Sequence, residues 1–273
     1  MNYADYVPFA GILLLTGVVS GILAGLLGIG GGGIIVPALA LALASMGYGG
    51  DVGQHVAVAS SLAIIIPIGI SSARSHYARG ALDIPTLKLW APVIFVATLS
   101  GGLSAGFLSG KVLQAVLGFM AFFIAANIFM PFQQRLMSGI QGSSIAHRVC
   151  AAVIGYLCAL MGTGGGALTV PTLAAFGLSM HTAIGTGAAI GVPIAIAGTI
   201  GFLISGWNAT GLPPFSIGYV NLPALVLIGG VASLIAPLGA KLAHNLPAKT
   251  LKKVFAVFLI AVGISMFWAA FRR

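Results

Sequence analysis

The sequence has very few ionisable side chains, and acidic ones are the scarcest. Its 273 residues include twelve Lys or Arg, three Asp and no Glu, so charged residues make up 5% of the chain. A soluble domain carries about 25% charged residues, and a chain with so few cannot cover a water-exposed surface with polar groups. The composition therefore excludes a cytosolic enzyme, a nucleic-acid-binding protein and a disordered chain.

Cysteine and catalytic groups are also scarce. The two cysteines, Cys150 and Cys158, are eight residues apart, which on a helix is about 12 Å of rise and too far for a disulfide. Both are therefore expected to be small buried apolar residues. No acidic residue is placed to orient a histidine, and no His or Cys pair has the spacing of a metal site. The sequence thus predicts neither an enzyme nor a bound cofactor.

Apolar side chains and glycine are abundant. Hydrophobic residues make up 59% of the chain, glycine occurs 40 times and the mean hydropathy is +1.12. These values are typical of an all-α polytopic membrane protein, because glycine is common in transmembrane helices. The net charge of +9 lies in short loops, where basic residues set membrane orientation. No basic residue precedes the first apolar stretch, so we expect this stretch to be retained and not cleaved as a signal peptide.

Apolar runs separated by Gly, Pro and charged residues predict ten helical segments. They cover residues 7–29, 33–47, 55–73, 87–109, 112–132, 146–162, 166–178, 181–205, 219–243 and 250–271. A spanning helix needs about 20 residues, and most segments reach that length. The second, sixth and seventh segments are shorter, and each lies beside a glycine cluster.

The chain repeats itself around these glycine clusters. The sequence GIGGGGIIVP at 28–37 matches GTGGGALTVP at 162–171, 134 residues later. Farther on, His55 and the Val-Ala after it match His181 and the Thr-Ala after it, 126 residues later, and the first half has the longer loop between the two blocks. The match fades after Gly206. Two matching blocks in the same order indicate a duplication.

Five segments per repeat is an odd number, so the two repeats must insert upside down relative to each other. Loop charges agree, because 74–88 and 241–253 are rich in basic residues while their repeat counterparts hold one at most. The positive-inside rule places these two loops and the linker in the cytoplasm and both termini outside. The predicted organisation is a first transmembrane repeat at 1–134, a cytoplasmic linker at 135–148 and a second transmembrane repeat at 149–273. Inverted repeats are common in secondary transporters.

The two glycine clusters are the strongest candidate site. Glycine lets the backbone turn sharply and leaves N–H groups bare, and the residues after each cluster would begin a new helix whose N-terminus attracts anions. Inverted repeats would bring the two turns together in a midplane cavity, where irregular backbone is tolerated. The candidate substrate-binding residues of the clusters are Gly30, Gly31, Gly32, Gly33, Thr163, Gly164, Gly165 and Gly166.

Glycines in membrane helices also serve close packing, and this alternative is favoured for the scattered Gly101, Gly102 and Gly106. A nucleotide-binding P-loop is disfavoured, because neither cluster continues into Gly-Lys-Ser/Thr. The sequence leaves open whether the turns belong to broken or re-entrant helix hairpins or to loops outside the membrane.

Together, the two Gly-Gly-Gly…Val-Pro blocks resemble the duplicated signature of the TauE/SafE sulfite exporter family, also called TSUP. The resemblance covers nearly the whole chain in length, repeat and segment order. It implies a permease of the bacterial inner membrane for sulfur-containing anions such as sulfite, organosulfonates, sulfoacetate or thiosulfate. At the level of single residues, the resemblance extends to the two glycine blocks only. The polar candidate residues below are therefore argued from their own chemistry.

Polar residues within apolar segments are functional candidates by default. His55 and His181 occupy the same repeat position, and each can donate to an anion or carry a coupling proton. The alternative is an interfacial histidine at the start of a helix. Gln54 adds an amide donor beside His55.

Hydroxyl groups and one guanidinium complete the candidate set. Ser60, Ser61 and Thr186 follow the histidines by one to two helical turns, and they can donate to anion oxygens or bond their own helix backbone. Arg74 can bind an oxyanion through two parallel hydrogen bonds. Basic groups at a helix end more often signal topology, and this alternative stays open.

The sequence therefore predicts a permease that carries a small sulfur-containing anion across the bilayer by alternating access, with a proton as an optional coupling ion. Its direction and oligomeric state stay open, since lipid-facing and partner-facing surfaces are both apolar. The alternatives are a passive anion channel, a membrane partner subunit without transport activity and an intramembrane enzyme acting on lipid. The missing acid–base residues disfavour the enzyme.

Overall fold

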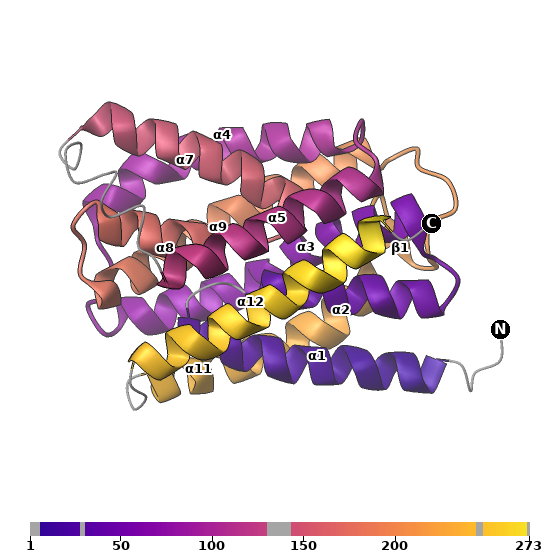
Figure 1. Cartoon of the computed structure of the whole chain (residues 1–273), viewed down its shortest axis with the longest axis horizontal. Coiled ribbons are helices and arrows are strands. Elements are labelled where there is room, and N and C mark those ends of the chain that lie inside the picture. The colour runs from indigo at the N-terminus through magenta and orange to yellow at the C-terminus, as the bar shows by residue number, and fades with distance from the viewer. Residues whose placement is uncertain (1–5, 28–30, 130–142, 244–247, 272–273) are drawn as a thin grey trace.

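Helices account for nearly all of the chain in the computed structural model, which describes residues 6–27, 31–129, 143–243 and 248–271 (Figure 1). Each of the ten predicted segments is helical. The helices are α1 (Tyr6–Leu27), α2 (Gly32–Ser45), α3 (Gly50–Tyr77), α4 (Ile84–Ala105), α5 (Gly110–Phe129), α7 (Ser144–Met161), α8 (Gly166–Ala175), α9 (Met180–Ser205), α10 (Leu222–Ala224), η2 (Leu225–Gly229), α11 (Gly230–Ala243) and α12 (Ala248–Phe271). The short α10 and the π-helical η2 lead directly into α11, so the three together form the ninth predicted segment.

The expectation of a purely α-helical chain needs one small correction. Between α9 and α10, β1 (Ser216–Ile217) pairs antiparallel with β2 (Val220–Asn221), and Gly218 turns between them at φ 52°. The hairpin is too short to show the alternating pattern that predicts strands.

Among the described residues, six helices are long and apolar enough to cross a membrane. They are Gly50–Tyr77, Ile84–Ala105, Gly110–Asn127, Ser144–Met161, Met180–Ser205 and Leu222–Gly239. In α3 and α9, 72% and 67% of the most apolar stretch is buried, against 33% to 44% in the other four. The pair α3 and α9 therefore forms the centre of the molecule, and the other spans surround it with apolar outer faces.

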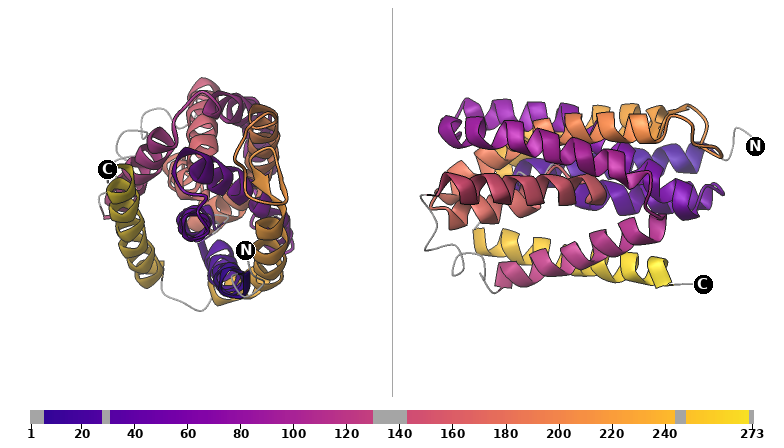
Figure 2. Two further views of the ribbon diagram at one scale, coloured as in Figure 1. Left: turned by 90° about the vertical axis from the view of Figure 1, so that its right-hand side faces the viewer. Right: turned by 90° about the horizontal axis from the view of Figure 1, so that it is seen from above.

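Helix packing follows one pattern in both halves of the chain. α4 packs against α7 and α9, and α11 packs in the same way against α1 and α3. α2 lies on α3 as α8 lies on α9, while α5 and α12 pack against each other along one side (Figures 1 and 2). Each of these contacts in one half of the chain therefore has a counterpart between the equivalent helices of the other half.

The same correspondence holds for individual residues. A Cβ on Gly155 of α7 would lie 2.8 Å from the carbonyl oxygen of Ile94, and a Cβ on Gly21 of α1 would lie 2.7 Å from that of Ala232. A Cβ on Gly101 of α4 would likewise lie 2.7 Å from Cβ of Ala159 on α7. Small residues allow such close backbone approach between membrane helices, which is the packing role expected for the scattered glycines.

The hairpins α1–α2 and α7–α8 enter from opposite ends of the molecule (Figure 1). At one end, the start of α3, which follows α2, contacts the end of α4 through His55 and Ala105. At the other end, the start of α9, which follows α8, contacts the residue before α4 through Thr186 and Asp83. The two connections are thus separated by the length of α4, about 33 Å for 22 residues.

Candidate functional site

In each hairpin the second helix begins directly after a glycine in the same left-handed conformation. α2 begins after Gly31, whose φ is 76°, and α8 begins after Gly165, whose φ is 79°. Only glycine adopts this left-handed region without strain. In each turn the glycine carbonyl accepts the first helical hydrogen bonds, from Ile34 and Ile35 in the first and from Leu168 and Thr169 in the second.

These two helix N-termini have no side-chain cap. Side chains of Asp83, Ser143, Ser179 and Asn221 cap α4, α7, α9 and α10. The N-caps of α2 and α8 are glycines. The N-cap of α3 is also a glycine, but it is exposed at the surface. The first N–H groups of a helix have no acceptor within the helix and lie at its positive end. The starts of α2 and α8 therefore place the positive ends of two helices inside the protein, where they are suited to an anion.

The two turns touch each other. A Cβ added to Gly32 would lie 2.6 Å from the carbonyl oxygen of Gly162 and 2.7 Å from Cα of Thr163. Ser61 of α3 donates its hydroxyl to that same carbonyl of Gly162, at 2.7 Å. The central helix thus holds the second turn against the first, and the Ser61 hydroxyl is used for this contact.

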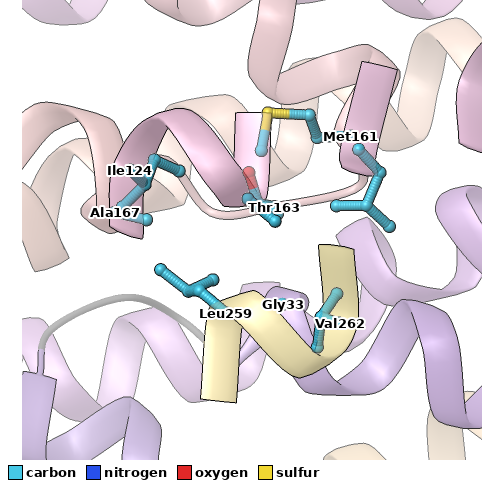
Figure 3. Close-up of a pocket in the computed structure, with 9 residues that line it drawn as sticks. Gly33, Ile124, Met161, Thr163, Ala167, Leu259 and Val262 are labelled. Carbon is cyan, nitrogen blue, oxygen red and sulfur yellow. The ribbon is translucent and has the colours of Figure 1, made fainter. Parts of the chain in front are cut away.

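A small pocket opens beside the contact between the turns (Figure 3). It is lined by Gly33, Leu117, Ala121, Ile124, Met161, Thr163, Ala167, Leu259 and Val262. Among these described residues Thr163 carries the one polar side chain, and it lies between Met161 and Ala167, across from α12. The pocket is therefore an apolar space with one hydroxyl and the start of each short helix, through Gly33 and Ala167, at its wall.

His55 lies apart from the turns, at the end of the molecule where α3 begins. It is buried, with Nδ1 2.7 Å from the carbonyl oxygen of Asp51 and Nε2 2.9 Å from that of Ala105. Both partners can only accept, so a doubly protonated ring satisfies both contacts and a neutral ring satisfies one. The ring centroid of Tyr219 is 4.9 Å away, and burial raises the pKa of that phenol, which keeps it neutral.

Gln54 is buried beside His55 with 1% of its surface exposed. Its Oε1 accepts from Nε2 of Gln114 on α5, at 3.4 Å. Its own Nε2 has no hydrogen-bond partner among the described residues. Sequence reasoning missed Gln114, because half-buried polar residues on α5 carry no repeat signal.

Two of the predicted hydroxyls lie away from the turns. Oγ of Ser60 accepts from the backbone N–H of Asn221 at 2.8 Å, and Oγ1 of Thr186 accepts from that of Asp83 at 2.9 Å. Each acceptor thus holds the N-cap residue of a helix from the other half of the chain.

This pairing extends the residue-level match between the two halves beyond Gly206, where the sequence match fades. Asp83-Ile84-Pro85 and Asn221-Leu222-Pro223 occupy equivalent places 138 residues apart. The similarity was in the sequence, but Asp and Asn at the two N-caps made it easy to overlook.

The remaining candidates are dispersed. His181 and Arg74 are both exposed, at the start of α9 and in the last turn of α3. Gly164 and Gly166 are buried within the second turn. Gly30 lies outside the described residues. Within the described residues, the structure thus gathers the start of α2, the second glycine turn, Ser61 and Thr163, and it leaves the two histidines at opposite ends of α4.

Comparison with known proteins gives a consistent result. The model of the family "Sulfite exporter TauE/SafE" matches residues 13–266. A probable membrane transporter protein of Haemophilus influenzae is 33% identical, over 94% of this chain and 97% of its own length. Probable membrane transporter proteins of Methanocaldococcus jannaschii and Bacillus subtilis (YunE) are 26% and 25% identical over 93% and 94% of this chain, and 94% and 97% of their own lengths.

No solved structure matches the chain. The family match covers more than nine-tenths of the sequence and includes both glycine turns. The chain therefore belongs to the TauE/SafE sulfite exporter family of multi-pass membrane transporters and is not an enzyme.

Proposed function

We propose that the chain is a secondary transporter that moves a small sulfur-containing anion, such as sulfite, an organosulfonate or thiosulfate, by alternating access. The observation that carries this proposal is the meeting of two uncapped helix N-termini beside the Thr163 pocket. The family name supports a sulfite-like substrate.

The chemistry of the site suits a small oxyanion. Sulfite and sulfonates offer only acceptor oxygens, and the helix starts and the Thr163 hydroxyl offer donors. Apolar walls strengthen these contacts, since the local dielectric is low. No lysine or arginine lines the pocket among the described residues, so the anion is held by partial charges. Binding of this kind is weak enough to allow release on the far side.

We also propose that 1–134 and 149–273 are inverted repeats joined by a cytoplasmic linker at 135–148. The matched packing of α4 and α11 supports this arrangement, as do the entry of the hairpins from opposite ends and the two equivalent glycine turns. The exposed Arg74, Arg79 and Lys88 lie at the end where α4 begins, which is the cytoplasmic end by the positive-inside rule.

His55 is the residue we propose for proton coupling. Its ring joins α3 to the end of α4, and loss of a proton would remove one of its two donors. A change of protonation would therefore loosen one helix contact, which is what coupling to a conformational change requires.

Flux in proteoliposomes tests the proposal. The purified chain would be supplied with sulfite, thiosulfate, sulfoacetate, taurine and a carboxylate control, with and without a pH gradient. We expect saturable flux of at least one sulfur anion, accelerated by the gradient. Non-saturable flux that never concentrates the anion would instead indicate a passive channel. Absence of flux for every sulfur anion would overturn the proposal and favour a partner subunit.

A further inference from the structure

The amide of Gln54 is a buried donor without an acceptor. Its surface is 1% exposed and its Nε2 has no hydrogen-bond partner in the part of the chain that the structure describes. Its Oε1 accepts from Nε2 of Gln114 at 3.4 Å, so in this arrangement of the two amides the Nε2 of Gln54 is the unpaired atom. Buried polar groups are nearly always paired, so an unpaired buried donor that lies near a proposed binding site is a candidate to bind an acceptor from outside the chain.

The position of Gln114 connects this donor to the pocket. Leu117, Ala121 and Ile124 of α5 line the pocket beside the glycine turns, and Gln114 precedes Leu117 by three residues. Spacings of three and four residues place all four side chains on one face of the helix. At 1.5 Å of rise per residue, Gln114 lies about 10 Å along α5 from Ala121.

The surrounding contacts fix this end of the helix bundle. The carboxylate of Asp51 accepts from the N–H of Gly110, at 2.8 Å, and His55 contacts the carbonyl oxygen of Ala105. The start of α3 is thereby attached to the end of α4 and the start of α5. The Gln54–Gln114 pair thus lies between this end of the molecule and the pocket, on the helix face that leads into it.

We infer that Gln54 Nε2 is a second binding site for the transported oxyanion, which the anion occupies on its way between the His55 end of the molecule and the glycine turns. This inference rests on the proposed function and adds a second polar binding site to the path of the transported anion. The ligand class is an oxyanion, because the unpaired group is a donor. A neutral amide binds such an anion without a full opposite charge, so the binding is weak enough for the anion to leave this site.

Replacement of Gln54 by leucine tests the inference by two measurements. Gln54→Leu removes the unpaired donor but also the acceptor of the half-buried Gln114 Nε2, so the two effects oppose each other and the melting temperature of the purified chain should change little. The KM for the transported anion should rise about tenfold, with a smaller change in maximal rate, because the anion loses one hydrogen bond. Gln54→Glu replaces the donor with a negative charge and should raise KM further.

Ser72→Ala is the matched control. Ser72 is also on α3, is 3% exposed and has an Oγ without a hydrogen-bond partner in the described residues, but it lies near the opposite end of α3, eighteen residues after Gln54. Its replacement should leave KM unchanged. An unchanged KM in both Gln54 variants, or an equal rise in Ser72→Ala, would overturn the inference while the wild-type flux keeps the proposed function intact. Absence of sulfur-anion flux in the wild type would overturn both.

Discussion

Adding one methyl group at Gly32 is the sharpest perturbation of the contact between the turns. The new Cβ would lie 2.6 Å from the carbonyl oxygen of Gly162 and 2.7 Å from Cα of Thr163. Ordinary van der Waals contact begins near 3.4 Å, so the two turns must move apart by roughly 0.8 Å. Overpacking of this kind costs about 1–3 kcal/mol of stability.

The same displacement should weaken anion binding. Hydrogen bonds from N–H groups span 2.7–3.2 Å, so donors on two separating turns cannot both reach one small anion. Loss of one hydrogen bond to a charged group costs about 1.5–3 kcal/mol, which corresponds to a rise in KM of about tenfold or more. We therefore expect Gly32→Ala to lower the melting temperature and to raise the KM of sulfur-anion flux.

Two glycine-to-alanine controls separate these effects. Gly101→Ala places a Cβ 2.7 Å from Cβ of Ala159, in the α4–α7 contact, so it should lower stability to a similar extent without a change in KM. Gly11→Ala meets nothing within 4 Å and should change neither. Wild-type KM and maximal rate in Gly32→Ala would refute the assignment of the site to the turns.

Three further predictions concern the turn glycines, His55 and the two hydroxyls that accept from N-cap residues. Gly31→Leu and Gly165→Leu force a side chain into φ values of 76° and 79°, at a cost of about 1–2 kcal/mol each, and should abolish flux although the chain still inserts into the membrane. Gly80→Leu imposes the same strain at an exposed turn with φ 66° and should leave flux intact; loss of flux in all three variants would count against a specific role of the turns. His55→Ala should remove the response of flux to a pH gradient, whereas His147→Ala, which removes a hydrogen-bond partner of Trp90, should keep it; a retained response in His55→Ala would exclude this histidine from coupling. Ser60→Ala and Thr186→Val each leave a backbone N–H without its acceptor, so each should lower the free energy of unfolding by about 1–3 kcal/mol. The two losses should add, because the contacts lie at opposite ends of the molecule, and a double variant no less stable than either single one would contradict the independence of the two contacts.

The helices could be predicted from sequence because their signals are local. Apolar runs interrupted by Gly, Pro and charge gave all ten segments, and the short segments beside the glycine clusters are the short helices α2 and α8. The clusters themselves identified Gly31 and Gly165 as turn residues, since a buried chain reversal between two helices requires a left-handed residue.

The use of each polar side chain could not be predicted, because it depends on contacts distant in sequence. Ser61 and Ser60 are neighbours on α3, yet one donates to Gly162 and the other accepts from Asn221. His55 and His181 share a repeat position, but one is buried against Ala105 and the other is exposed. The walls of the pocket from α5 and α12 are ordinary apolar residues, which no sequence pattern distinguishes from residues that face lipid.

The central claim is that the anion binds where the glycine turns meet, and Thr163 tests it most directly. Flux of the transported sulfur anion would be measured for Thr163→Val, Thr163→Ser and Thr199→Val, the last of which removes a buried hydroxyl that donates to Ala195 of its own helix. The account predicts a KM raised about tenfold in Thr163→Val, near wild type in Thr163→Ser and unchanged in Thr199→Val. A wild-type KM in Thr163→Val, with normal insertion, would contradict it.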